Sequence, residues 1–342
     1  IGVILAVRES LGVSEFNDWG WRIPFLISAV LVGVSIYIRL KMSESPLFSK
    51  IKSEGKISKN PLKESFGKKE NLKLVLIALF GATAGQGVVW YTGQFYAMTF
   101  IENTCKVEFI QTRNIIAIAL VIGTPLFIYF GWLSDRMGRK MIMMIGMLAA
   151  VFLYRPIYKQ MYEAADVKNK TELPGLKVID RSSSKNEQGV LITTSKATNF
   201  YEGGNRMVKT SFYQGDSDKP AEEKTEILLG DQDFWMMVML VLIQVVLVTM
   251  VYGPIAAFLV ELFPTKIRYT SMSLPYHIGN GIFGGLVPFI ATSLYEMSKT
   301  DSNPTGDPFA GLWYPIIVSA VCFTIGMIYL SNRKKADVLE DT

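Results

Sequence analysis

The ten-residue stretch GWLSDRMGRK, residues 131–140, joins two long apolar runs and decides the fold of the chain. It holds one carboxylate, three cations and two glycines: Asp135, Arg136, Arg139, Lys140, Gly131 and Gly138. A helix needs ~20 apolar residues to cross a hydrocarbon core ~30 Å thick, and the flanking runs are close to that length. The stretch therefore predicts a short charged connection between two membrane helices.

The rest of the chain repeats this alternation of apolar blocks and polar gaps. The 342 residues are 50% hydrophobic, with a mean hydropathy of +0.27, and the charges are confined to the gaps. We predict an all-α polytopic membrane protein with the end of one helix at 1–7 and seven whole spans. The spans are 20–40, 72–101, 110–133, 139–157, 233–262, 271–296 and 309–331.

The Lys and Arg residues predict the orientation. Residues 39–73 carry ten basic against four acidic residues, and this loop falls on the same side as 131–140, the Lys266 turn and the C-terminal tail. Loops rich in Lys and Arg stay in the cytoplasm. We expect a multi-pass protein of the plasma (inner) membrane with its basic loops and C-terminus cytoplasmic.

Residues 158–232 interrupt the pattern with a long polar stretch. The runs KVID, GVLITT and MVKTSFY resemble short strands separated by Gly, Asn and Asp. By the alternation of sides, we predict an extracytoplasmic, β-rich insert. A disordered loop is the alternative.

Several classes of function lack support in the sequence. Cys105 and Cys322 form no disulfide framework or metal-ligand spacing. A phosphate-binding loop, a metal-ligand cluster and a nucleophile–base pair are also not found, so we expect no enzyme activity, no cofactor and no metal. The net charge of +5 gives no reason to expect nucleic acid as a partner.

A second charged cluster lies on the predicted cytoplasmic side, in ELFPTKIRYTSMS, residues 261–273. Glu261 ends one span and Arg268 precedes the next, and carboxylates at this depth are costly unless they are paired. Together with the first cluster, these residues predict a gate of ion pairs that opens and closes the cytoplasmic side. Its members are Asp135, Arg136, Arg139, Glu261 and Arg268. The alternative is that the cations are membrane anchors, which we favour for Lys140.

These motifs together resemble the major facilitator superfamily. GWLSDRMGRK looks like its G-x-L-x-D-R-x-G-R-[KR] signature between the eighth and ninth helices, and ELFPTKIRYTSMS resembles the E-x-F-P-x-x-x-R turn between the tenth and eleventh. SESPLF, 43–48, and GWRIPF, 20–25, resemble stretches around the sixth helix. The pattern is most similar to the metabolite:proton symporter branch, whose members carry proline, betaine, α-ketoglutarate, citrate or shikimate. Sugar porters are the next most similar group.

The resemblance implies twelve helices in two halves, of which this chain holds the C-terminal portion. It begins at Ile1 inside an apolar run, so we expect a fragment that is inactive alone, with Glu44 separated from its family partners. The implied organisation is the end of the N-terminal bundle at 1–42, an interbundle loop at 43–71, helices seven to nine at 72–157, the insert at 158–232, helices ten to twelve at 233–331 and a tail at 332–342.

Candidate solute-binding residues lie in three spans. Gln86, Trp90, Tyr91 and Gln94 recur near helical spacing in a glycine-rich span whose family counterpart lines the cavity. Amides supply hydrogen bonds and aromatic rings supply cation–π contacts. Helix–helix packing through interhelical hydrogen bonds is the alternative. Tyr252 adjoins a Gly-Pro break, and Asn280 and His277 lie in the eleventh helix. His277 is a weaker candidate for a proton relay, because a lone histidine is as often a packing residue.

These observations predict a secondary active transporter of a small organic solute, working by alternating access and coupled to protons. The expected partners are the solute, protons and the lipid bilayer, and we expect a monomer when full length. A sugar-porter-like transporter is one alternative. A membrane sensor that keeps the transporter fold and uses the insert to bind a ligand or partner is another.

Overall fold

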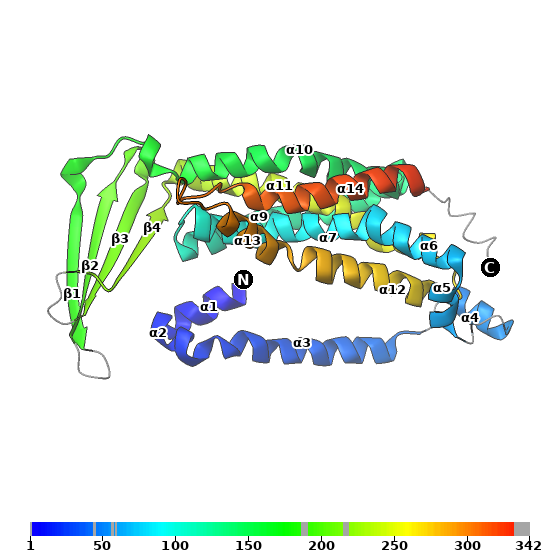
Figure 1. Ribbon diagram of the computed structural model, residues 1–342. Helices are drawn as coiled ribbons and strands as arrows, with labels where there is room; N and C mark the ends of the chain where they lie inside the picture. Colours follow the sequence, from blue (N-terminus) through cyan, green and yellow to red (C-terminus); the bar gives the residue numbers. More distant parts are fainter. Residues whose placement is uncertain are drawn as a thin grey trace. The chain divides into compact units, whose positions relative to one another are not determined.

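The computed structural model describes residues 2–43, 46–55, 58, 60–185, 191–214 and 219–331 (Figure 1). Glu44 and the predicted tail, 332–342, lie outside these ranges. The described chain divides into two compact units. The first contains residues up to 72 together with 260–272, and the second contains 73–259 and 273–331.

Within the described residues, seven helices are long and apolar enough to cross a membrane. They span Arg22–Lys41, Lys69–Thr104, Phe109–Met137, Arg139–Ala165, Asp231–Leu262, Arg268–Met297 and Ala310–Tyr329. Six of them coincide with a predicted span to within four residues and the seventh, Arg139–Ala165, runs eight residues past the predicted end, so the prediction of a polytopic helical membrane protein is confirmed. The side that faces the cytoplasm remains the prediction made from the Lys and Arg counts.

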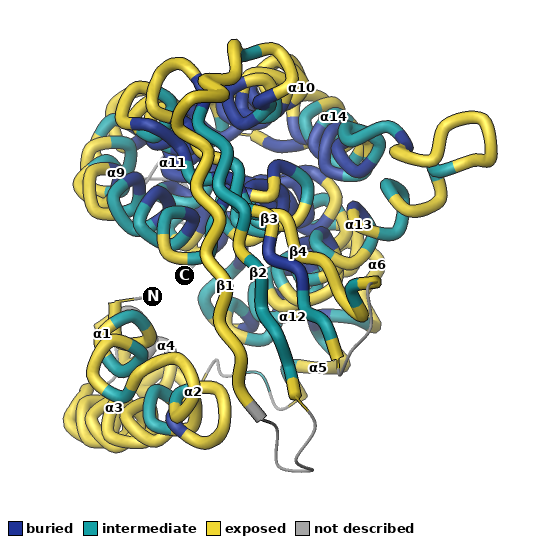
Figure 2. Tube along the Cα trace, turned by 90° about the vertical axis from the view of Figure 1, so that its left-hand side faces the viewer, coloured by how far each residue is buried: buried dark blue, intermediate teal, exposed yellow. Residues whose placement is uncertain are grey.

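The first unit contains short helices and one long span. Its helices are α1 (Gly2–Leu11), α2 (Val13–Glu15), α3 (Arg22–Lys41), α4 (Pro46–Ser53) and α5 (Pro61–Gly67). Helix α3 is apolar on all sides and has no buried residue (Figure 2). Helix α5 begins where the Asn60 side chain accepts a hydrogen bond from the Lys63 amide, with Pro61 at its first position.

The second unit is a bundle of helices. Its helices are α6 (Lys69–Ala78), α7 (Ala84–Tyr91), α8 (Ala97–Thr99), α9 (Phe109–Met137), α10 (Arg139–Ala165), α11 (Asp231–Leu262), α12 (Arg268–Ile278), α13 (Val287–Met297) and α14 (Trp313–Tyr329). The first residues of α6 and the turn between α11 and α12 belong to the first unit. Helix α7 packs against α14 and against the segment between α12 and α13.

Wide π-helical turns and glycines shape the centre of this bundle. Leu79–Thr83 and Thr92–Tyr96 flank α7, and Gly279–Gly284 joins α12 to α13. A Cβ atom added at Gly87 would lie 2.2 Å from the carbonyl oxygen of Gly279. Only glycine permits this approach of two backbones.

The polar insert folds as a four-stranded antiparallel sheet in the order β1-β2-β3-β4. The strands are Val178–Lys185, Leu191–Phe200, Arg206–Gln214 and Glu222–Leu228. The β-rich prediction is confirmed over its described residues, and the predicted start at residue 158 is wrong. Helix α10 continues to Ala165, because Tyr158 and Met161 continue its buried face and Tyr158 donates a 2.9 Å hydrogen bond to the Thr92 carbonyl.

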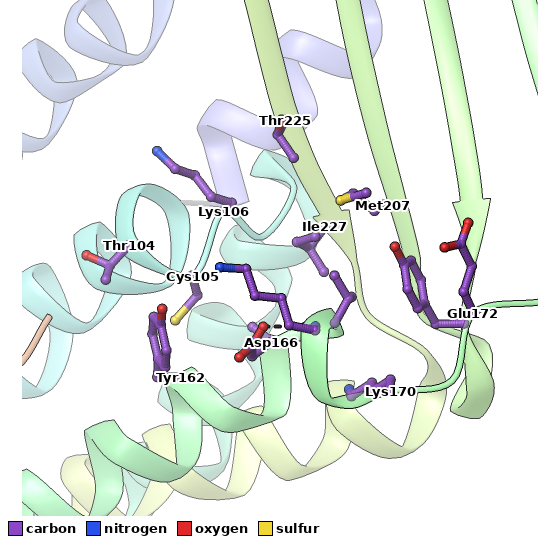
Figure 3. A pocket seen from close by; sticks show the side chains of 14 residues that line it. Thr104, Cys105, Lys106, Tyr162, Asp166, Lys170, Glu172, Met207, Thr225 and Ile227 are labelled. Carbon is purple, nitrogen blue, oxygen red and sulfur yellow. Dashed lines mark hydrogen bonds between the residues drawn. The ribbon is translucent and has the colours of Figure 1, made fainter. Parts of the chain in front are cut away.

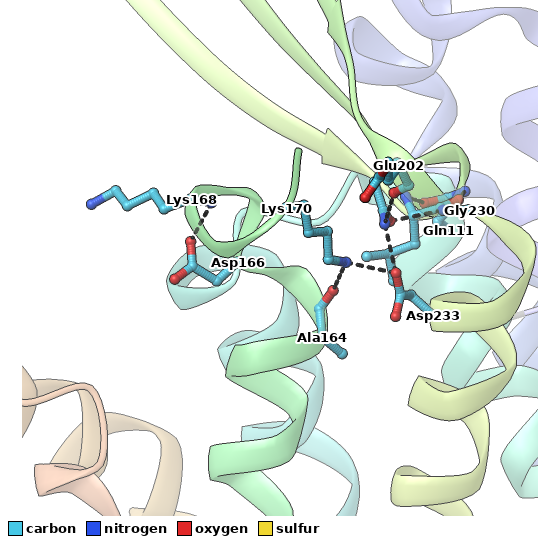
Figure 4. A network of polar contacts seen from close by, with 10 residues as sticks. Gln111, Ala164, Asp166, Lys168, Lys170, Glu202, Gly230 and Asp233 are labelled. Atoms are coloured by element: carbon cyan, nitrogen blue, oxygen red, sulfur yellow. Dashed lines mark hydrogen bonds and ion pairs between the residues drawn. The ribbon is translucent and has the colours of Figure 1, made fainter. Parts of the chain in front are cut away.

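Polar contacts at its base hold the sheet on the helices of the second unit (Figure 4). The Asp233 carboxylate accepts from Lys170 Nζ and from Asn205 Nδ2, both at 2.6 Å. The Asn205 side chain also accepts from the Gly230 amide at 2.9 Å. Gln111 of α9 exchanges two hydrogen bonds with the backbone of Leu229. The sheet is therefore joined to α9, α10 and α11.

Candidate functional site

Two amides meet where α7 crosses the π-helical segment Gly279–Gly284. Gln86 Nε2 donates to Asn280 Oδ1 at 3.0 Å, and Asn280 Nδ2 donates back to Gln86 Oε1 at 3.1 Å. Asn280 Nδ2 also donates to the Tyr276 carbonyl at 3.0 Å. Gln86 is fully buried, whereas Asn280 is partly exposed. In this conformation Gln86 acts as a packing residue, and Asn280 is the member of the pair with exposed surface.

Aromatic rings gather one helical turn beyond Gln86. The centroids of Trp90 and Tyr252 lie 4.4 Å apart, and Phe127 of α9 contacts both rings at 6.1 and 5.9 Å. The hydroxyls of Tyr252 and Tyr276 form a 2.8 Å hydrogen bond. Trp90, Tyr252 and Tyr276 are partly exposed. We call the residues Trp90, Phe127, Tyr252 and Tyr276 the aromatic cluster. They come from α7, α9, α11 and α12, and together with Asn280 they form an aromatic–amide surface.

Tyr91 and Gln94 lie apart from this cluster. Tyr91 stacks on Phe95 with centroids 5.1 Å apart and packs against Gly284. The Gln94 side chain has a buried Nε2 with no hydrogen-bond partner among the described residues. The π-helical turn that starts at Thr92 adds a residue to the turn and rotates the following side chains. Gln86 and Trp90, four residues apart in α7, therefore share a face, whereas Tyr91 is offset by one residue from Trp90 and Gln94 lies within the π-helical turn.

His277 is exposed on α12, and its ring meets the edge of Tyr276 with centroids 5.8 Å apart. Among the described residues it has no polar side-chain partner. A proton relay requires a chain of hydrogen-bonded groups, so the structure adds no support for this role, which stays a prediction.

The opening stretch folds as the end of α9 and the start of α10. Asp135 lies in the last turn of α9, where it pairs with Arg139 Nη2 at 2.9 Å. The Arg136 guanidinium lies 4.1 Å from the centroid of the Trp132 ring. Gly138 separates the helices with φ of 97°. Lys140 Nζ donates to the Met327 and Leu330 carbonyls at 2.9 and 2.6 Å, and so caps the end of α14.

The other two predicted gate residues lie in the first unit. Glu261 is in the last turn of α11, and Arg268 begins α12. Arg268 Nε donates to the Phe263 carbonyl at 3.0 Å, which tightens the turn, and its Nη2 is buried without a hydrogen-bond partner among the described residues. Because the gate residues are divided between two units, the gate itself stays a prediction.

The sequence did not predict a polar clasp inside the first unit. Glu64 of α5 pairs with Lys266 at 3.0 Å, and Ser271 donates to Ser65 at 2.9 Å, with both serines fully buried. A hydrogen bond from the Ser58 hydroxyl, with further help from Lys266, lowers the pKa of Glu64 to about 2. The clasp joins α5 to the turn after α11.

Sequence reasoning also missed Phe127 and Tyr276, which complete the aromatic cluster. Phe127 follows Pro125 in an apolar span with no distinguishing neighbour, and Tyr276 directly precedes His277. The only available signal was their position in spans expected to line a cavity. Their contacts with Trp90 and Tyr252 depend on how α9, α11 and α12 pack.

Seven spans, a charged turn between α9 and α10 and an aromatic–amide surface define a polytopic membrane protein. The family model of the major facilitator superfamily matches residues 11–158. Over 301 residues it is 26% identical to the inner membrane metabolite transport protein YhjE of Escherichia coli, covering 86% of this chain and 52% of that protein. Over 330 residues it is 22% identical to the alpha-ketoglutarate permease of Escherichia coli, covering 95% and 56%.

The chain therefore spans about half the length of the curated relatives it matches. No solved structure matches it.

Proposed function

We propose that the chain forms part of a secondary active transporter that moves a small polar organic solute across the inner membrane, and that it is not an enzyme. The match of residues 11–158 to the superfamily model, the transport functions named in the two relatives and the seven apolar spans support this proposal. The chain spans about half the length of these relatives, so the activity is proposed for the complete protein.

The aromatic cluster beside Asn280 is the observation that carries the proposal. Ring faces attract cationic groups, and a side-chain amide can donate hydrogen bonds to a carboxylate. The rings of Trp90 and Tyr252 lie against each other at a tilt of 33°, with centroids 4.4 Å apart, so a solute would lie over their exposed surface rather than between the rings. This chemistry suits a zwitterion such as an amino acid or a betaine, and also an organic acid bound mainly by the amide.

Alternating access would use the charged residues at the ends of α9, α10 and α11 as the cytoplasmic gate. The ion pair between Asp135 and Arg139 supports this part of the proposal. Proton symport rests on the resemblance to the metabolite:proton symporters. No Asp or Glu lies at mid-depth of any span in the described part of the chain, so the coupling group would be elsewhere in the transporter.

Uptake by proteoliposomes made with the product of the complete gene tests the proposal. Radiolabelled proline, glycine betaine and 2-oxoglutarate would be offered separately, with and without an inward proton gradient. We expect one class of solute to accumulate, and to accumulate faster with the gradient. Uptake no faster than in protein-free liposomes for every solute and gradient, from correctly folded protein, would overturn transport. Uptake that ignores the gradient would overturn proton coupling alone.

The folded sheet favours a second candidate, a membrane sensor that uses the insert. A sheet fixed to α9 and α11 by the contacts of Gln111 and Asp233 is suited to pass a binding event to the bundle. A sensor would bind solute without uptake, and replacing residues 171–228 with a short linker would abolish its signal. A transporter would retain uptake after the same replacement.

A further inference from the structure

A cavity of about 500 Å³ lies at the junction of the sheet with the helices (Figure 3). This volume falls within the ~300–1,000 Å³ of small-molecule sites. The cavity is formed by the connection before α9, the end of α10 and strands β3 and β4, and it is separate from the aromatic cluster. Cys105, Met207 and Ile227 give it an apolar lining, and Tyr162 and Thr225 add hydroxyls.

Most charged groups around this cavity already have partners. Asp166 accepts from the Lys168 amide and from Asn169 Nδ2, at 3.0 and 3.2 Å. Glu172 accepts from Asn199 at 2.9 Å, and Lys170 pairs with Asp233.

Unlike these charged groups, the ammonium groups of Lys106 and Lys168 have no partner among the described residues. Both side chains line the cavity and are exposed. Asp166 and Glu172 keep their negative charges, because their partners are neutral amides, but the hydrogen-bond donors left without a partner are the two ammonium groups. The available cations and the apolar lining complement an anion that carries an apolar body.

The backbone at Lys106 is a second, independent observation. Lys106 has φ of 59°, and it is the only non-glycine residue with positive φ in the described part of the chain. The Lys106 carbonyl accepts from the Ile227 amide at 2.7 Å, and this contact with β4 holds the conformation. Such conformations cost about 1–3 kcal/mol and cluster at ligand sites. The strained residue stands at the cavity and supplies one of its two available cations.

We propose that this cavity binds a small organic anion, with its acidic group at Lys106 and Lys168 and its apolar body against Met207 and Ile227. Two sources share this chemistry: a soluble carboxylate, and the headgroup of an anionic lipid. Both can reach the site, because it adjoins the ends of the spans Lys69–Thr104 and Arg139–Ala165. The site is independent of the proposed transport function.

Binding of 3-fluorophthalate, followed by fluorine NMR, tests the proposal on the whole chain in nanodiscs of neutral phosphatidylcholine. This probe is an aromatic dianion, and 4-fluorobenzamide is its neutral counterpart. We expect the dianion to bind, the double variant Lys106→Gln/Lys168→Gln to weaken binding at least tenfold, and Thr225→Trp to block it by filling the cavity. The matched control Lys177→Gln/Lys196→Gln removes two exposed lysines outside the lining and should bind normally.

A second arm identifies the source of the anion. In nanodiscs that contain phosphatidylglycerol, native mass spectrometry would measure the lipid retained by the chain. Retention by the wild type but not by Lys106→Gln/Lys168→Gln, together with competition against fluorophthalate, identifies a lipid headgroup. Fluorophthalate binding without such retention identifies a soluble anion. Equal binding in the double variant and its control, or no binding of either anion to folded wild type, would overturn the proposal.

Discussion

Gln86 and Asn280 satisfy each other with two amide hydrogen bonds at the crossing of α7 with the π-helical segment Gly279–Gly284. Each amide stands next to one of the two glycines that bring the backbones together, Gly87 and Gly279. Interhelical amide pairs in membranes are worth roughly 0.6–2 kcal/mol. The pair therefore fixes the packing on which the neighbouring aromatic cluster depends.

Breaking this pair on one side should destabilise the protein. Gln86→Leu leaves the Asn280 amide without its main partner, which we expect to cost about 1–3 kcal/mol. Thermal unfolding in detergent measures the loss. The double variant Gln86→Leu/Asn280→Leu should recover part of it, because no polar group is then left unpaired. Gln160→Leu on the exposed surface of α10 is the control. A single variant as stable as this control would contradict the structural role.

Removing the Trp90 ring should weaken solute recognition rather than folding. We expect Trp90→Leu to raise the KM for uptake about tenfold, since a cation–π contact is worth about 0.5–2 kcal/mol. Tyr252→Phe keeps the ring and loses only the hydroxyl contact with Tyr276, so its effect should be smaller. Trp235→Leu, at an exposed position of α11, should leave KM unchanged. An unchanged KM in Trp90→Leu would remove this residue from the binding surface.

The two glycines of the opening stretch should respond oppositely to alanine. Gly138 has φ of 97°, so Gly138→Ala introduces strain of about 1–3 kcal/mol and should lower the unfolding temperature. Gly131 lies inside α9, and an added Cβ would meet no atom within 4 Å. Gly131→Ala should therefore stabilise the protein by about 0.5–1 kcal/mol. Equal effects of the two variants on thermal unfolding would refute this assignment.

The polar clasp of the first unit should make stability depend on pH. The pKa of Glu64 is about 2, below its usual 4.5, so its contribution is fully present above pH 4.5 and is lost as pH falls toward 2. Glu64→Gln should therefore be less stable than the wild type at pH 7, and the difference should shrink by pH 3.5. Glu70→Gln, which alters an exposed carboxylate of α6, is the control for thermal unfolding. A difference that stays constant over this range would exclude the clasp as its cause.

Gln244 of α11 should be replaceable with a gain in stability. It is fully buried, its Oε1 has no hydrogen-bond partner among the described residues, and its Nε2 reaches only Met161 Sδ and the Leu240 carbonyl at 3.4 Å. Gln244→Leu removes the unpaired group and should raise stability by about 1 kcal/mol. Thermal unfolding against Gln160→Leu measures this gain, and a loss would show that the amide has a partner in solution.

The helical part of the fold could be predicted because the bilayer imposes it. An apolar run of sufficient length must satisfy its backbone internally, and so it forms a helix whatever its neighbours are. The strand-like runs of the insert were visible for a similar local reason, the turn residues between them. The end of α10 was misplaced because Tyr158 and Met161 are buried by tertiary contacts, which a polar local composition conceals.

The sequence by itself determined the spans, the charged turn at 131–140 and the residue types available for a site, because hydrophobic length and charge act locally. Only the tertiary structure decided which of these residues meet. It joined Gln86 to Asn280 and Trp90 to Tyr252, turned Tyr91 and Gln94 away, and placed Lys140 on the end of α14. These contacts depend on helix crossings set by glycine positions and π-helical turns, and a one-residue change in a turn rotates every side chain that follows.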